Sequence, residues 1–195
     1  MSSDALRTSR TPRRAAAALL ALPLLLAAGS ARAQLGGGEE AAIRALFPGA
    51  DRIEARDVLL TDALVARIER LARARVQERL VTFYAAHRAG AVAGYAVIHS
   101  HVVRTKRETL AIAFEPDGRI RKIQVLAFLE PEEYRPSDRW LAQFAGKGPA
   151  DPLRVGDDVV NATGSTLTSR GIAEQSRWLL QALRSAVIEQ ERAAR

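Results

Sequence analysis

The side chains best suited to chemistry lie near the carboxyl end, where residues 155–171 read VGDDVVNATGSTLTSRG. A pattern typical of a long helix follows this segment, and Gly164 lies within it. Backbone N–H groups at a helix N-terminus attract anions, and a glycine lets a ligand approach the backbone closely. The segment therefore suits a phosphate group, although it lacks the lysine of a P-loop. Its hydroxyl side chains are Thr163, Ser165, Thr166, Thr168 and Ser169.

The same residues have a simpler explanation. Serine and threonine are favoured at the residue that caps a helix, so Thr168 or Ser169 would cap a turn rich in hydroxyl groups. On composition alone, the cap and the phosphate site both remain open.

Residues 163–169 (TGSTLTS) resemble the Ser/Thr-Gly-Ala-Thr-x-Ser/Thr-Ser motif of the FMN-binding domain family. This family includes the covalent-flavin subunits of Rnf and Na⁺-translocating NADH:quinone reductase complexes, and small exported relatives. The order of segments is also similar: a signal or anchor, a β meander, a W-x-x-x-F segment from Trp140 to Phe144, the motif and a closing helix. Two positions depart from the pattern, because Ser165 stands where alanine is usual and Val160 where aspartate is usual.

The resemblance implies that the hydroxyl of Thr166 is bonded to the phosphate of FMN. A separate FAD:protein FMN transferase makes this bond in the family, so the chain would be a substrate of that enzyme and carry no catalytic residue of its own. Its role would be electron transfer with an unidentified redox donor and acceptor, for which a membrane reductase is one candidate. Thr163, Gly164, Ser165, Leu167, Thr168 and Ser169 would complete the cofactor-binding set.

Other polar residues would extend this cofactor site. Arg104, Thr105 and Lys106 would line the cofactor cleft and balance the negative charge of a reduced flavin, with Asn161 beside the motif. Glu130 would approach the flavin or a partner, and the alternative is that it belongs to an acidic surface loop.

His99 and His101 form a second cluster. They are two residues apart, so in a strand both side chains point to the same side. Two imidazoles on one face suit a metal ion or haem. The alternative is a pair of half-exposed strand histidines without a ligand.

The distribution of charge argues for export. The chain has 195 residues, a formal net charge of +7 and no cysteine, which excludes disulfides, thiol nucleophiles and cysteine-ligated metals. Residues 1–33 combine a basic start, an apolar run from Ala15 to Ala28 and an A-x-A ending, which together are typical of a cleaved signal peptide. This segment holds five arginines and one aspartate, so its cleavage would remove +4 of the net charge of +7. The remaining +3 predicts no nucleic-acid partner. We expect a periplasmic or otherwise exported protein, with a retained membrane anchor as the alternative.

Periodicity predicts one α+β domain over residues 34–195, in which an antiparallel β meander packs with an N-terminal helix and a long C-terminal helix. The expected helices are 39–47, 61–76, 137–144 and 169–192, and the expected strands are 81–86, 90–103, 109–115 and 119–128. No hydrolase motif is present. The favoured function is an exported electron-transfer flavoprotein. An exported non-redox binding module for an anionic ligand or partner protein is the alternative, and a haem or metal carrier is the third.

Overall fold

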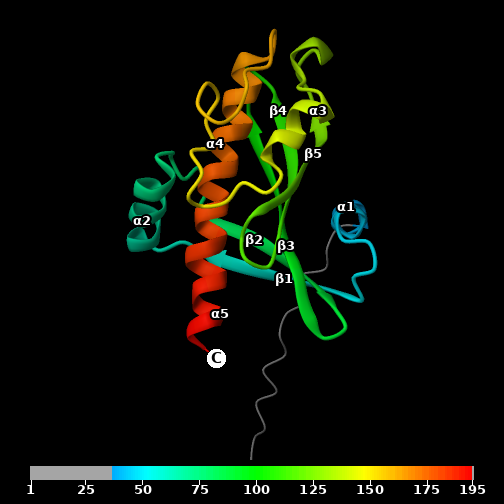
Figure 1. The fold of residues 1–195 in the computed structure, drawn as a ribbon, viewed down its shortest axis with the longest axis vertical. Helices are drawn as coiled ribbons and strands as arrows, with labels where there is room; N and C mark the ends of the chain where they lie inside the picture. Colours follow the sequence, from blue (N-terminus) through cyan, green and yellow to red (C-terminus); the bar gives the residue numbers. More distant parts are fainter. Residues whose placement is uncertain (1–36, 195) are drawn as a thin grey trace, which may run out of the picture. The chain divides into compact units, whose positions relative to one another are not determined.

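Five antiparallel strands form a sheet in which each strand pairs with the next along the chain (Figure 1). The computed structural model describes residues 37–194, and the expected signal peptide at residues 1–33 lies outside them. With a short N-terminal helix and a long C-terminal helix against the sheet, the described residues confirm the predicted α+β meander. The strands are β1 (Arg52–Leu59), β2 (Leu80–Arg88), β3 (Ala91–Val102), β4 (Arg107–Phe114) and β5 (Ile120–Phe128).

The first strand was not predicted. β1 alternates charged and apolar residues and lies at the edge of the sheet, so none of its eight residues is fully buried. Its apolar signal is therefore too weak to read from the sequence. His87 of β2, opposite Arg52 in the β1–β2 register, is buried.

The helices largely follow the prediction, with shifted ends. Thr61 caps α2, and its Oγ1 accepts from the N–H of Leu64 at 3.3 Å. α2 ends at Ala72 rather than near residue 76, because Arg73 adopts a left-handed backbone with φ 47°. The helices are α1 (Gly37–Leu46), α2 (Asp62–Ala72), α3 (Asp138–Leu141), α4 (Thr166–Leu183) and α5 (Glu189–Ala193), with 3₁₀ turns at Glu132–Tyr134 and Ala142–Phe144 and a π-helical turn at Arg184–Ile188.

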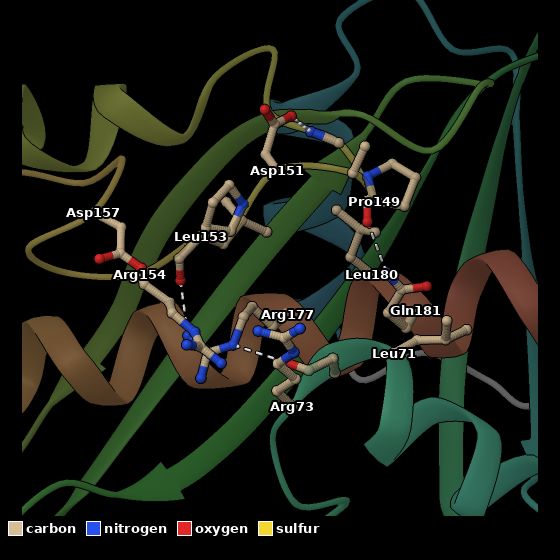
Figure 2. A pocket seen from close by; sticks show the side chains of 14 residues that line it. Leu71, Arg73, Pro149, Asp151, Leu153, Arg154, Asp157, Arg177, Leu180 and Gln181 are labelled. Carbon is tan, nitrogen blue, oxygen red and sulfur yellow. Dashed lines mark hydrogen bonds between the residues drawn. The ribbon is translucent and has the colours of Figure 1, made fainter.

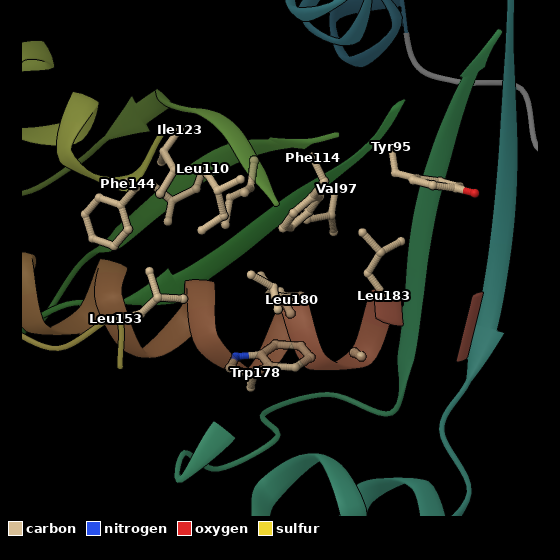
Figure 3. Packing of buried hydrophobic residues seen from close by; sticks show 14 of the residues in the cluster. Tyr95, Val97, Leu110, Phe114, Ile123, Phe144, Leu153, Trp178, Leu180 and Leu183 are labelled. Atoms are coloured by element: carbon tan, nitrogen blue, oxygen red, sulfur yellow. The ribbon is translucent and has the colours of Figure 1, made fainter. Parts of the chain in front are cut away.

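The main core lies between the sheet and α4 (Figure 3). Trp178 of α4 is fully buried there, and its ring makes an edge-on contact with His99 of β3 at 5.2 Å. Trp140 and Phe144 extend this core with an edge-on ring contact of 5.3 Å, so both tryptophans are core residues. α1 covers the opposite face of the sheet through Ile43, Leu46 and Phe47. None of the helices in residues 37–194 has the length and apolarity to cross a membrane.

Candidate functional site

The hydroxyl-rich segment forms a turn that leads directly into α4. Gly164 has a φ of 83°, a left-handed conformation that glycine adopts at little cost. Ser165 occupies the cap position without a side-chain cap hydrogen bond, and Thr166 is the first helical residue. The prediction that Thr168 or Ser169 caps the helix was therefore wrong. Both are buried in the first turn, where the Ser169 hydroxyl donates to the carbonyl of Ser165 at 2.8 Å.

Thr166 is half-buried, and within residues 37–194 its side chain makes one hydrogen bond. The Nδ2 of Asn161 lies 3.5 Å from Thr166 Oγ1, so these two predicted residues are brought together. The N–H groups of residues 166–168, the first three of α4, have no intrahelical acceptor, and no cap side chain satisfies them. The start of α4 thus combines a reachable hydroxyl with unsatisfied N–H donors.

A shallow cavity of about 190 Å³ opens beside this turn. It is lined by residues 164–168 together with Arg104 and Tyr134, which come from the β3–β4 turn and the segment after β5. The Arg104 guanidinium lies over the Tyr134 ring, 4.6 Å from its centroid. This cation–π contact positions a cation next to the hydroxyls. Thr163, Asn161 and Ser169 do not line the cavity.

Thr105, Lys106 and Glu130 have a different role from the predicted one. The Oε1 of Glu130 accepts from the backbone N–H groups of Thr105 at 2.7 Å, Lys106 at 2.8 Å and Arg104 at 3.3 Å. These backbone hydrogen bonds lower the pKa of the carboxyl. Glu130 is buried, so the alternative of an acidic surface loop does not describe it. It fixes the β3–β4 turn that carries Arg104, and neither it, Thr105 nor Lys106 lines the cavity.

His99 and His101 are both buried between β3 and α4, so half-exposed histidines were the wrong expectation. Their rings stack at 6.0 Å with an interplanar angle of 8°. His99 Nδ1 lies 2.8 Å from Glu78 Oε1, and its Nε2 lies 3.0 Å from Gln175 Oε1. Both ring nitrogens of His99 are therefore occupied within the protein.

His101 faces Glu108, its partner across the β3–β4 ladder. The Nε2 of His101 lies 3.3 Å from Glu108 Oε2, but no polar side-chain atom of either residue makes a hydrogen bond. Burial lowers the pKa of His101 to about 4 and raises the pKa of Glu108 to about 8. At neutral pH both side chains are thus uncharged, a buried pair beneath the first turns of α4.

α4 approaches this pair closely. A Cβ added at Gly171 would lie 3.1 Å from His101 Nε2, so only glycine leaves the imidazole its present room. Within residues 37–194, no group of three or more histidine, aspartate or glutamate side chains is placed to hold a metal ion.

The sequence analysis did not identify two residues of these sites, Glu108 of the buried pair and Tyr134 of the cavity. Glu108 shares its strand face with Leu110 and Ile112, and the period-two pattern of that strand would have placed it in the core. Tyr134 lies in the connection between β5 and α3, whose course no periodic signal fixes.

No protein-family model and no curated protein matches this chain. What it binds must therefore be inferred from its own residues.

Proposed function

We propose that the protein is an electron-transfer flavoprotein that carries FMN covalently on Thr166. The observation that carries the proposal is the position of Thr166 Oγ1: it lies at the first residue of α4, in the cavity that Arg104 lines. A phosphate ester there would meet the N–H groups of the first turn and the positive end of the helix dipole. The resemblance of residues 163–169 to the FMN-binding motif supports the same assignment.

The size of the cavity matches one end of such a cofactor. Pockets that enclose a small ligand measure about 300–1,000 Å³, and this one measures about 190 Å³. It fits the phosphate end, so the ring system would lie at the surface, open to redox partners. FMN, when bound, supplies the redox chemistry.

The chain's own residues would hold and orient the group. Thr166 provides the ester oxygen, and Asn161 steadies that hydroxyl. Arg104 offsets the phosphate charge, with Tyr134 beneath its guanidinium and Glu130 fixing its backbone. Loading would require an FAD:protein FMN transferase, and electrons would come from an external donor, for which a membrane reductase is a candidate in an exported protein.

Coexpression with an FAD:protein FMN transferase tests the proposal. We expect a fluorescent band on a denaturing gel and a mass increase of one FMN less one water. Thr166→Ala should abolish both. Ser165→Ala is the matched control, because it removes the neighbouring hydroxyl and restores the family's usual alanine, and it should keep the flavin. Loss of flavin in Ser165→Ala with retention in Thr166→Ala would place the bond elsewhere.

One alternative rests on the same cavity. A helix N-terminus beside an arginine also binds anions without a covalent bond. A non-redox binding module of this kind would remain colourless and unmodified when the transferase is present.

A further inference from the structure

A second cavity, of about 330 Å³, lies between the end of α2, the loop at 148–157 and the middle of α4 (Figure 2). Three arginines from these three segments line it: Arg73, Arg154 and Arg177. Arg177 lies eleven residues after Thr166 on the same helix, which corresponds to about 16 Å along its axis. The cavity is therefore separate from the flavin site proposed above.

Arg177 is held in place by the backbone of the cavity wall. Its Nε donates to the carbonyl of Ala72 at 3.0 Å, and its Nη1 donates to the carbonyl of Leu153 at 2.8 Å (Figure 2). Carbonyls fix the plane of a guanidinium without cancelling its charge. Because a guanidinium has five N–H donors, three remain for another acceptor. Burial, followed by the charge of Arg154, lowers the pKa of Arg177, and the charges of Glu174 and Asp158 only partly oppose this shift.

Arg73 and Arg154 add two more cations without carboxylate partners. No side chain in the described part of the chain makes a hydrogen bond or ion pair with either guanidinium. Arg73 and Leu153 both have left-handed backbones, with φ values of 47° and 48°. Such conformations are costly for residues other than glycine, and the surrounding fold holds them there.

The rest of the wall defines what the arginines would bind. Asp151 accepts from the N–H of Gly148 at 2.7 Å and is thus committed to its own loop, while Asp157 is exposed. Leu71, Leu153 and Leu180 form an apolar part of the wall. Cations therefore outnumber carboxylates, and an apolar surface lies beside them.

We propose that this cavity binds a small organic anion, with its phosphate or carboxylate head on Arg154 and Arg177 and its apolar body against the leucines. Guanidinium groups contact such oxyanions through paired N–H donors. Arg73, at the exposed rim, completes the set.

Calorimetric titration of the purified protein tests this with four probes: phenyl phosphate, benzoate, inorganic phosphate and benzyl alcohol. We expect phenyl phosphate or benzoate to bind more tightly than inorganic phosphate, and benzyl alcohol not to bind. The better of the two aromatic anions identifies the head group. Equal binding of benzyl alcohol, or no binding of either aromatic anion, would overturn the proposal.

Variants then assign the binding to this cavity. Arg154→Gln and Arg73→Gln remove guanidiniums that make no internal hydrogen bond, so both should fold, and each should raise the Kd about tenfold. Arg139→Gln removes an exposed arginine of α3 outside the cavity and should leave the Kd unchanged. Unchanged affinity in folded Arg154→Gln would show that the ligand binds elsewhere. Thr166→Ala should bind the probe as well as the wild type does. The anion-binding result is therefore independent of whether Thr166 carries a flavin.

Discussion

The buried pair His101–Glu108 makes the stability of the protein depend on pH in a specific way. The pKa of Glu108 rises from 4.5 in the unfolded chain to about 8 in the fold, so between these values the native state holds one proton more. The free energy of unfolding should therefore fall by about 1.4 kcal/mol for each pH unit in that window. The pKa of His101 falls from 6.5 to about 4, so between pH 4 and 6.5 the unfolded state holds the extra proton and stability should rise with pH.

The two effects oppose each other between pH 4.5 and 6.5, because in that range the unfolded chain has lost the proton of Glu108 and still holds the proton of His101. Above pH 6.5 only Glu108 contributes. From pH 6.5 to 8 the free energy of unfolding should therefore fall by about 2 kcal/mol. Other titratable or charged groups near the pair also affect the two pKa values: His99 lowers the pKa of His101, and Arg135 lowers the pKa of Glu108.

Glu108→Gln isolates the effect, because glutamine has nearly the shape of a protonated glutamate and does not titrate. The free energy of unfolding of the variant should not fall between pH 6.5 and 8 as that of wild type does. The difference between variant and wild type should therefore increase by about 2 kcal/mol over that interval, in favour of the variant. Below pH 6.5 it should show the rise due to His101 alone.

Urea unfolding at several pH values, followed by the fluorescence of buried Trp140 and Trp178, measures these curves. Glu133→Gln, at an exposed position, is the matched control and should follow wild type throughout. Parallel curves for wild type and Glu108→Gln between pH 6.5 and 8 would refute a neutral buried pair. So would a wild type whose free energy of unfolding does not fall between pH 6.5 and 8.

Three further substitutions test individual contacts of the fold. Gly171→Ala should destabilise the protein by about 1–3 kcal/mol in urea unfolding, because its Cβ would press on His101, whereas an open helical position would gain from alanine. Gly94→Ala should cost about 3 kcal/mol or prevent folding, since its Cβ would lie 2.4 Å from the carbonyl of Phe114; a stable variant would contradict the register of β3 and β4. Glu130→Ala leaves the N–H groups of the β3–β4 turn without their acceptor. Hydrogen exchange of these N–H groups should therefore become faster, while exchange in α4 should not change. Unchanged exchange in the turn would show that the carboxylate does not order it.

The sequence predicted the elements that have a strong period. Strands β2 to β5, helix α2 and the long closing helix follow from apolar spacing. β1 could not be predicted in this way, because an edge strand needs few apolar residues.

Contacts between distant segments were harder to predict. The motif itself identified Thr166, but its neighbours depend on how the β3–β4 turn and the segment after β5 fold. The burial of His99 and His101 depends on α4 crossing that face of the sheet, which local spacing does not encode. Glu130 was singled out for its charge, yet its partners are backbone N–H groups that the sequence does not distinguish from any others.

The most direct test of the central proposal is to locate the flavin on the chain. Trypsin cleaves after Arg154 and Arg170, so every hydroxyl of the motif falls in one peptide, residues 155–170. After coexpression with an FAD:protein FMN transferase, we expect this peptide to carry one FMN less one water, with fragment ions placing it on Thr166. An unmodified peptide from protein coexpressed with an active transferase, or a flavin on any other residue, would contradict the proposal.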